Sequence, residues 1–165
     1  MFARLALLAA VLLVVAPARA GDLRLTIDGV RSDAGALMIG LYSTRDGYEV
    51  ALDRSAEPGR LNDPVRLIGV ALRATPGAHT VVFADLPPGR YAVIAFHDEN
   101  DDGRMNKRMA VPTEGYGFSN NAQGFLKPPS FDAAAVAVAD APVAAKISLV
   151  YPSRPQQSLS EGRLP

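Results

Sequence analysis

The sequence predicts an all-β protein, an antiparallel β-sandwich of about seven strands with an immunoglobulin-like or transthyretin-like arrangement and one long functional loop. Three features support this fold class. Several short segments alternate between apolar and polar residues, turns rich in glycine and proline separate them at regular intervals, and no segment has the apolar period of a convincing amphipathic helix. A small barrel is the alternative architecture.

The first 20 residues have the features of a signal peptide. Arg4 supplies a positive start, an apolar run covers 5–16, and Ala18-Arg19-Ala20 forms a small-residue cleavage site. The run is shorter than the roughly 20 apolar residues that cross a bilayer. We therefore expect an exported protein, periplasmic or extracellular, with a domain at 21–151 and a flexible tail at 152–165.

The composition excludes several functional classes. The chain has no cysteine, so it offers neither a disulfide framework nor a cysteine for a lipid anchor. Once Arg4 and Arg19 are removed with the leader, 15 basic residues remain against 17 acidic ones, a formal charge of −2. The basic residues are scattered along the chain, which is not the electrostatic footprint of a nucleic-acid-binding protein. We therefore expect no nucleic-acid partner and no stable membrane anchor.

The N-terminal part of the domain contains two strand patterns. Apolar residues alternate with polar ones within 22–30 and again within 36–42. The turn-forming sequence Ser-Asp-Ala-Gly lies between these segments, which together predict an antiparallel hairpin. Residues 43–63 show no sustained apolar period and are interpreted as a connection that holds at most one helical turn.

The most hydrophobic strand of the domain is expected at 91–96, YAVIAF, and we place it at the centre of a sheet. Residues 98–131 follow it, combine glycine, proline and polar residues without a period, and are interpreted as the long functional loop. Other short strands are expected at 65–74, 79–84, 133–139 and 146–151.

The start of the long loop has the pattern of a calcium-binding loop. The run from Asp98 to Asn106 fits D-x-N-x-D-G-x-x-N, and calcium loops place oxygen ligands at alternate positions with glycine at the sixth. Met109 stands where an EF-hand has its bidentate glutamate, so the last ligand must come from Glu114 or Asp132. The expected metal ligands are Asp98, Asn100, Asp102, the carbonyl group of Arg104, Asn106 and Glu114.

Other interpretations of this loop remain open. Acidic turns rich in Asn and Gly also form when side chains cap their own backbone. His97 directly precedes the loop and could serve as the general base of a hydrolase with Asp98 or Glu114, although the chain has no G-x-S-x-G motif and no cysteine nucleophile. A transition-metal site formed by His97, Asp98 and His79 is a further alternative, and no spacing rule supports it.

A second motif, EGYGFSNN, runs from Glu114 to Asn121. Ligand sites use an apolar platform with a few orienting polar groups, and this motif supplies aromatic rings and amides. The expected residues for binding a small molecule, glycan or peptide are His97, Tyr116, Phe118, Asn120 and Asn121. The alternative is a loop that folds back on the sheet and is pinned by its two aromatic rings.

Three stretches carry a resemblance to a known family: LPPGRYAVIAFHDENDDGRMN from Leu86, PTEGYGFSNNA from Pro112 and PPSFDAA from Pro128. They resemble the shared pattern of the exported bacterial family called domain of unknown function 2141. Two departures are Asn106, where an aspartate is common, and Leu126-Lys127, which fills a segment that is often shorter. The resemblance implies an exported protein whose signature is the loop, and it implies no activity.

From the sequence we therefore expect an exported binding or accessory module whose acidic loop 97–106 is held by calcium or by its own hydrogen bonds. Calcium is the only cofactor that the pattern suggests. One alternative is a structural envelope protein that self-associates through a sheet edge, and another is a hydrolase that uses His97. The fold does not choose among these functions, because sandwiches host all of them.

Overall fold

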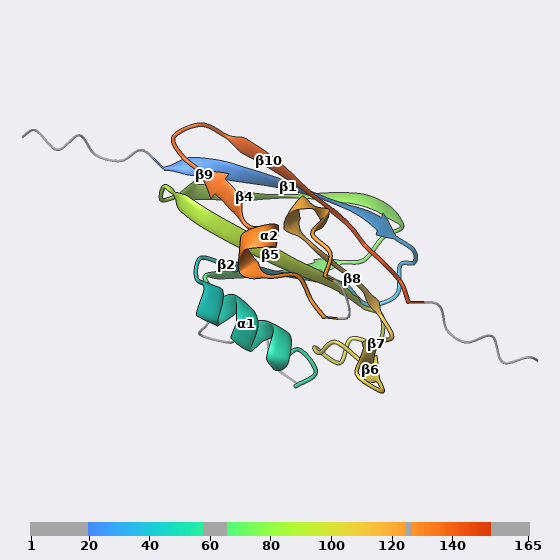
Figure 1. Cartoon of the computed structure of the whole chain (residues 1–165). Coiled ribbons are helices and arrows are strands. Elements are labelled where there is room, and N and C mark those ends of the chain that lie inside the picture. The colour runs from blue at the N-terminus through green and yellow to red at the C-terminus, as the bar shows by residue number, and fades with distance from the viewer. Residues whose placement is uncertain (1–19, 58–65, 125–126, 153–165) are drawn as a thin grey trace, which may run out of the picture.

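Figure 1 shows the computed structural model of the chain, which describes residues 20–57, 66–124 and 127–152. Nearly all of the expected leader and of the expected tail lies outside these described residues. The described part is mostly β-structure arranged in several sheets, and none of them closes into a barrel. None of its helices is long and apolar enough to cross a membrane.

Two sheets form successive layers, with a helix beneath the second layer (Figure 1). The first layer is a three-stranded sheet in the order β10-β1-β4, and the second is a five-stranded sheet in the order β3-β2-β5-β8, in which β9 also pairs with β5. The strands of these sheets are β1 (Gly21–Val30), β2 (Ala36–Tyr42), β3 (Ile68–Arg73), β4 (Gly77–Leu86), β5 (Gly89–Asp98), β8 (Gly115–Phe118), β9 (Val136–Val138) and β10 (Val143–Ser148).

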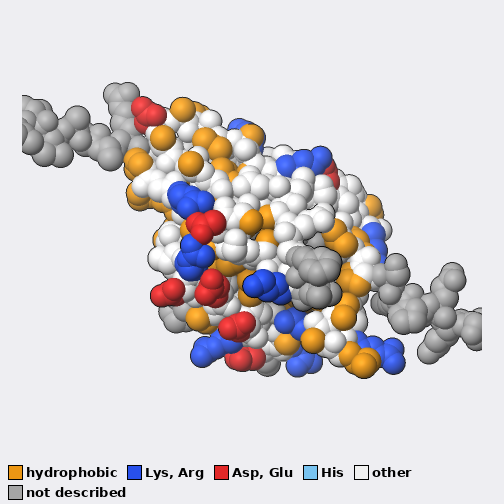
Figure 2. Space-filling model, viewed as in Figure 1, with side chains coloured by type: hydrophobic (Ala, Val, Ile, Leu, Met, Phe, Trp, Pro, Cys, Tyr) orange, Lys and Arg blue, Asp and Glu red, His pale blue; other side chains and the backbone are white. Residues whose placement is uncertain are grey.

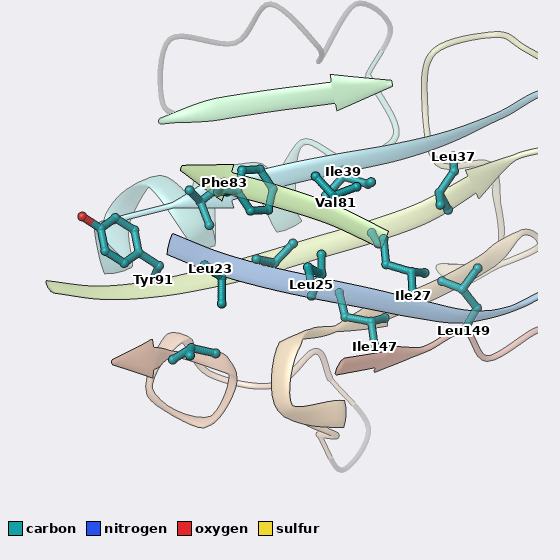
Figure 3. Close-up of a cluster of buried hydrophobic side chains, with 14 of the residues drawn as sticks. Leu23, Leu25, Ile27, Leu37, Ile39, Val81, Phe83, Tyr91, Ile147 and Leu149 are labelled. Carbon is teal, nitrogen blue, oxygen red and sulfur yellow. The ribbon is translucent and has the colours of Figure 1, made fainter. Parts of the chain in front are cut away.

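The main core lies between the two sheets, where alternate residues of each strand point inward. Leu23, Leu25 and Ile27 of β1 are buried there, which confirms the sequence pattern of this segment. Figure 3 shows these side chains meeting those of the neighbouring strands. The core also includes Leu37, Ile39, Val81, Phe83, Tyr91, Val93, Ile147 and Leu149.

The prediction that residues 22–30 and 36–42 form a hairpin is wrong. β1 pairs with β4 and β10, whereas β2 pairs with β3 and β5, so the two segments belong to different sheets. Alternation identifies the buried face of a strand, but it does not identify the neighbouring strand. The pairing of β1 with β10 is parallel, which also corrects the expectation of a purely antiparallel arrangement.

Helix α1 (Arg45–Asp53) occupies a segment that was expected to be a connection with at most one helical turn. Thr44 caps its N-terminus, because its side-chain oxygen accepts a hydrogen bond from the backbone N–H of Gly47 at 3.2 Å. The helix buries Tyr48 completely against the outer face of the five-stranded sheet. Its sequence shows little apolar period because Gly47 and Tyr48 supply its only buried positions.

The strand expected at the centre of a sheet is confirmed. β5 is antiparallel to β2 on one side and to β8 on the other. Its odd-numbered residues from Tyr91 to Ala95 enter the main core, and Ala92 and Ile94 point to the opposite face. This strand is apolar throughout because both of its faces are covered.

The long segment expected as a loop at 98–131 contains several short elements. They are the two-stranded hairpin β6 (Lys107–Arg108) and β7 (Val111–Pro112), strand β8, and the 3₁₀ turn η2 (Ser119–Asn121). Helix α2 (Phe131–Ala134) begins at the end of this segment. These elements have two to four residues each, which is too short for a period to appear in the sequence.

Candidate functional site

The acidic loop begins at Asp98, the last residue of β5, whose side chain is only 1% exposed. Its two carboxylate oxygens accept hydrogen bonds from the backbone N–H groups of Asp102 at 3.2 Å and Gly103 at 2.7 Å. Gly103 has a φ of 74°, which a residue with a Cβ adopts at a cost. Asp98 therefore caps the turn that its own sequence motif forms.

Asp102 is the centre of the polar contacts within this loop. Its Oδ2 atom accepts hydrogen bonds from the side chains of Asn100 and Asn106, both at 3.0 Å, and from Nε of Arg104 at 2.9 Å. Its Oδ1 atom accepts one from the backbone N–H of Arg104 at 3.2 Å. Asn100 and Asn106 thus meet Asp102, as expected of three metal ligands, whereas Arg104 contributes its guanidinium and backbone N–H instead of the expected carbonyl group.

Glu114 closes the loop from the opposite side and is 5% exposed. Its two carboxylate oxygens accept the backbone N–H groups of Glu99 at 3.2 Å and Asn106 at 2.9 Å. Burial raises the pKa of Glu114, and the negative charges of Asp98 and Asp102 raise it further, against the opposing effect of the two N–H donors. Two buried carboxylates, at positions 98 and 114, thus hold the two ends of the acidic loop.

A hard cation such as calcium prefers oxygen ligands, and the loop would have to rearrange to supply them, because Nε of Arg104 lies 2.9 Å from Oδ2 of Asp102. Asn100 and Asn106 now direct their NH₂ groups toward Asp102, and a half-turn of either amide would replace that donor by a carbonyl oxygen. Oδ1 of Asn106 is buried and accepts no hydrogen bond in the described part of the chain. Among the described residues, no group of three or more histidine, aspartate or glutamate side chains is arranged to hold a metal ion.

His97 is buried and both of its ring nitrogens are engaged. Nε2 donates to the carbonyl oxygen of Ala34 at 2.8 Å, so Nδ1 is the acceptor for the Tyr151 hydroxyl at 2.7 Å. The guanidinium group of Arg31 lies over the Tyr151 ring, 4.2 Å from its centroid. His79 lies on β4, in the other sheet, where its Nε2 is 2.8 Å from the carbonyl oxygen of Thr75.

Two glycines of the signature segment allow β8 to lie close to its neighbours. A Cβ atom on Gly117 would stand 2.4 Å from Cγ2 of Ile147, and one on Gly115 would stand 2.3 Å from the Tyr151 ring. The alternate residues Tyr116 and Phe118 point to the outer face of the five-stranded sheet, because β8 pairs in register with β5. The pattern Gly-Tyr-Gly-Phe therefore places bare backbone on one face and aromatic rings on the other.

The two asparagines of the signature segment hold the backbone. Both have positive φ, 61° for Asn120 and 49° for Asn121, which asparagine tolerates better than most residues. Nδ2 of Asn120 donates to the carbonyl oxygen of Ala135 at 3.0 Å, and Oδ1 of Asn121 accepts the backbone N–H of Ser148 at 2.6 Å. These amides were expected to contact a ligand, and the structure shows them bonded within the protein.

Ser119 belongs to the EGYGFSNN motif, but it was not among the residues expected to bind a ligand. It is fully buried, and its hydroxyl accepts from the backbone N–H of Val93 at 2.8 Å and donates to the carbonyl oxygen of Ala134 at 2.6 Å. It therefore ties β5 to α2 through a single side chain. Its place in the EGYGFSNN motif was the sequence signal, and that signal did not indicate a structural role.

A cavity of about 720 Å³ opens on the outer face of the five-stranded sheet. Its walls come from the sheet itself, from α1, from the β6–β7 hairpin and from the described residues around 121–129. Tyr116, Phe118 and Asn121 belong to its lining, whereas His97 and Asn120 do not. The apolar residues of the lining include Met38, Ala51, Leu52, Ile94, Phe96, Met105, Val111, Tyr116 and Phe118.

An aromatic cluster closes the cavity toward α2. The Tyr48 ring makes edge contacts with Phe118 and Phe131, whose centroids lie 6.4 Å and 6.0 Å away, and its hydroxyl donates to the carbonyl oxygen of Pro129 at 3.2 Å. Asp132 joins these elements at the surface, because its carboxylate pairs with Arg45 of α1 and, at 2.7 Å, with Arg90 of β5. Asp132 is therefore engaged away from the acidic loop, where it was an alternative ligand.

Comparison with known proteins identifies one relationship. Neither the curated proteins nor the solved structures contain a match to this chain. A family described as uncharacterized proteins conserved in bacteria matches residues 25–146, which include the acidic loop, the signature segment, six whole strands of the two layered sheets and most of β1 and β10. The match confirms the resemblance seen in the sequence motifs, and the chain belongs to this family, domain of unknown function 2141.

Proposed function

We propose that this protein is an exported binding module that holds a largely apolar small molecule in the cavity on the outer face of its five-stranded sheet. The observation that carries this proposal is the position of Tyr116 and Phe118, the aromatic residues of the family signature, in the wall of a cavity of about 720 Å³. Small-molecule sites commonly have volumes of about 300–1,000 Å³. A glycan is less well matched, because Asn120 lies outside the cavity and Oδ1 of Asn121, which lines it, already accepts a backbone N–H.

The chemistry of the lining supports an apolar ligand with a polar end. Ile94, Phe96 and Met105 supply aliphatic and aromatic surface, and each CH₂ group that a ligand buries there contributes about 0.8 kcal/mol. The hydroxyl of Tyr116 forms no hydrogen bond with the rest of the described chain, so it can donate to or accept from a ligand. Lys107 and Lys127 also line the cavity and favour an anionic group on the ligand.

The finer architecture and the location are part of the same proposal. The two layers enclose one apolar core, which supports a β-sandwich of immunoglobulin-like or transthyretin-like kind with a parallel edge pair. The apolar leader and the Ala-Arg-Ala site support export, to the periplasm or beyond the cell. N-terminal sequencing of protein from the periplasmic fraction tests the export: a chain beginning at Gly21 is expected, and retention of Met1 in the cytoplasm would contradict it.

Binding in the cavity is tested with the apolar fluorescent probe anilinonaphthalene sulfonate. The chain from Gly21 is expected to enhance the probe's fluorescence, and the double variant Tyr116→Ala/Phe118→Ala is expected to weaken binding at least tenfold. Val82→Ala removes exposed apolar surface from the other sheet and serves as the control, since Val82 is 45% exposed on β4. Equal binding by the double variant and the control would contradict the proposal.

Fluorescence alone does not separate a lost site from a lost fold, so a filling variant is also needed. Ala51 lines the cavity from α1, and Ala51→Phe would occupy part of the volume. This variant is expected to retain the wild-type melting temperature to within a few degrees while it excludes the probe. A variant that still binds the probe with full affinity would place the site elsewhere.

A second proposal is that the acidic loop binds calcium and thereby orders the cavity's rim. Its support is the convergence of Asn100, Asp102 and Asn106, together with the buried Oδ1 atom of Asn106 that accepts no hydrogen bond from the described residues. Gly103 and Met105, which follow the acidic residues, line the cavity, so an ion in the loop would act on the same site. Calcium at a hundred times its dissociation constant is expected to add about 2.7 kcal/mol of stability.

Thermal melts with excess calcium and with chelator test the calcium proposal. The wild-type melting temperature is expected to rise by several degrees in calcium. Asp98→Ala is destabilising in itself because the side chain caps a turn, so the quantity to compare is the calcium-dependent shift within each variant. Asp132→Asn, a carboxylate change outside the loop, should keep the shift and Asp98→Ala should abolish it. A wild type without any shift would make the acidic residues turn formers only.

The two remaining alternatives receive less support. A hydrolase would need a free base, whereas both nitrogens of His97 are bonded within the protein and its side chain is buried. Equal turnover of ester substrates by wild type and His97→Ala would remove this alternative. Self-association through a sheet edge would use β3, whose outer side pairs with no described strand, and a monomer in light scattering at high concentration would count against it.

A further inference from the structure

We propose that the β6–β7 hairpin docks this protein on the surface of an anionic lipid bilayer. The hairpin lies on the same side of the five-stranded sheet as α1, at one end of the molecule (Figure 1). It forms part of the wall of the cavity through Lys107, Ala110 and Val111. The docking concerns the outer surface of this hairpin and does not depend on what the cavity holds.

The tip of the hairpin is apolar and strongly exposed. Met109 is 91% exposed and Val111 is 55% exposed. Turns normally carry Gly, Asn, Asp or Ser, which suit both the backbone and the solvent. Single exposed apolar residues are common on soluble proteins, so exposure alone would not indicate a function. The backbone of the same two-residue turn supplies the independent observation.

The turn holds two residues in a conformation that disfavours them. Met109 and Ala110 have φ values of 50° and 65°, and the flanking strands pair Lys107 with Pro112 and Arg108 with Val111. A two-residue turn with two positive φ angles is the position at which Asn-Gly is strongly preferred. A methionine here places its side chain at the tip at the expense of backbone strain, and such strain concentrates at functional sites.

The charges around the tip complement an anionic surface. Lys107 and Arg108 are both exposed, and neither forms an ion pair within the described residues. The nearby acidic loop opposes this attraction only in part, because Arg104 pairs with Asp102 at 2.9 Å and Arg31 pairs with Glu99. Figure 2 shows basic and apolar side chains next to one another at the end of the molecule where Figure 1 places the hairpin.

A lipid bilayer fits this surface better than a protein partner does. An exposed apolar group flanked by cations matches a layer of anionic headgroups above acyl chains. Because the hairpin forms part of the cavity wall, docking would also bring the cavity close to the bilayer, so that an apolar ligand could pass between the two. That last link rests on the proposed function, and the docking itself does not.

Vesicle flotation tests the docking with the chain from Gly21, which contains every described strand and helix and lacks the apolar leader. Binding to vesicles of phosphatidylcholine mixed equally with phosphatidylglycerol is expected, together with little binding to phosphatidylcholine alone. Each basic residue near an anionic surface strengthens partition about fivefold, so Lys107→Gln/Arg108→Gln should weaken it roughly 25-fold. The matched control Arg24→Gln/Arg73→Gln removes two exposed charges from other strands and should leave most of the binding intact.

A second variant separates the apolar tip from the fold. Met109→Asn/Ala110→Gly installs the residues that the turn prefers, so the melting temperature should stay the same or rise while vesicle binding falls several-fold. A variant that lost both stability and vesicle binding would contradict this expectation, because the substitution removes backbone strain from the turn. Unchanged vesicle binding by both hairpin variants would overturn the proposal, as would the absence of any binding to anionic vesicles.

The outcomes also distinguish this proposal from the proposed function. Met109→Asn, at an exposed position that does not line the cavity, is compared with Tyr116→Ala/Phe118→Ala in both the vesicle assay and the fluorescent-probe assay. A variant that loses probe binding but keeps vesicle binding is altered in the cavity alone. A variant that loses vesicle binding but keeps probe binding is altered in the hairpin alone. Binding of polyglutamate without binding of anionic vesicles would overturn the bilayer in favour of an acidic protein partner.

Discussion

Gly117 illustrates how single residues shape the signature segment. Its missing side chain lets β8 lie against β10, since a Cβ atom there would stand 2.4 Å from Cγ2 of the buried Ile147 and 3.1 Å from the carbonyl oxygen of Ser148. The sequence motif could not reveal this reason, because it contains no information on which strand passes behind β8. The neighbouring Tyr116 points the other way, into the cavity wall.

Gly117→Ala is expected to destabilise the protein by about 1–3 kcal/mol, because overpacking forces either the side chain or the strand to move. Thermal denaturation would show a fall of about 3 °C per kcal/mol for a domain of this size. Gly89→Ala is the control, since its added Cβ would meet the Tyr91 ring at an ordinary contact distance of 3.4 Å. Equal melting temperatures for the two variants would contradict the packing argument.

Glu114 should make stability depend on pH. Its pKa is raised in the folded state, chiefly by burial, so the folded protein binds this proton more tightly than the unfolded chain does. The stabilising contribution is fully present below the unfolded pKa and is lost as the pH rises through the folded pKa. Relative to Glu114→Gln, the wild type should therefore gain stability as the pH falls from 7 to about 5.

Denaturant unfolding of wild type and Glu114→Gln across this pH range measures the effect. Glu49→Gln, a change of an exposed carboxylate on α1, is the control and should leave the pH dependence of the wild type unchanged. The hydrogen bonds to Arg31 lower the pKa of Glu99, and those to Arg45 and Arg90 lower the pKa of Asp132. The stabilising contributions of these two carboxylates are therefore lost only at more acidic pH. A pH-independent difference between wild type and Glu114→Gln would contradict the assignment.

The candidate residues of the acidic loop were identifiable from their spacing, but their partners were not. Asp98 and Glu114 are buried, and each accepts two backbone N–H groups. The roles of Asn120 and Asn121 were predicted differently, because an amide in a motif looks the same whether it serves a ligand or the backbone. In the structure the Asn120 amide is bonded to the backbone outside the cavity, whereas Asn121 lines the cavity with its Oδ1 bonded to Ser148, and these positions cannot be read from a sequence.

Among the elements, helix α1 matters most for the cavity, because Ala51, Leu52 and Asp53 form one of its walls. Thr44→Ala removes the hydrogen bond to the N–H of Gly47 and should cost about 1 kcal/mol, whereas Thr44→Ser should retain most of the stability. Thermal melts measure the cost. We also expect weaker probe binding by the Ala variant, since the wall would fray. Identical melts for the two variants would contradict the capping role.

At the element scale, the sequence was informative wherever a strand has one buried face or two. β1 showed its period of two, and β5 showed the continuous apolar run of a strand covered on both sides. The hairpin β6–β7, strand β8 and helix α2 escaped prediction because they have at most four residues each. Helix α1 escaped because its buried face consists almost entirely of one tyrosine.

For the whole molecule, burial predicts a gradient of local stability. β5 is hydrogen-bonded to β2 and β8 and is covered on both faces, whereas β6 and β7 pair only with each other among the described strands. Hydrogen exchange followed by mass spectrometry should therefore find the slowest amides in 92–97 and the fastest among 107–112. Comparable protection of the two segments would contradict this ordering.

The parallel pair of β1 and β10 joins the two ends of the domain, with Leu23 beside Val143 and Asp28 beside Ser148. The three-stranded sheet cannot be completed until nearly the whole chain is available, because the last strand must close a loop of more than a hundred residues onto the first. Such distant pairing slows folding. A chain that crosses a membrane in an unfolded state must not fold before it has crossed. The delay would help such a chain, because β10, the last strand to emerge, is needed to complete the sheet.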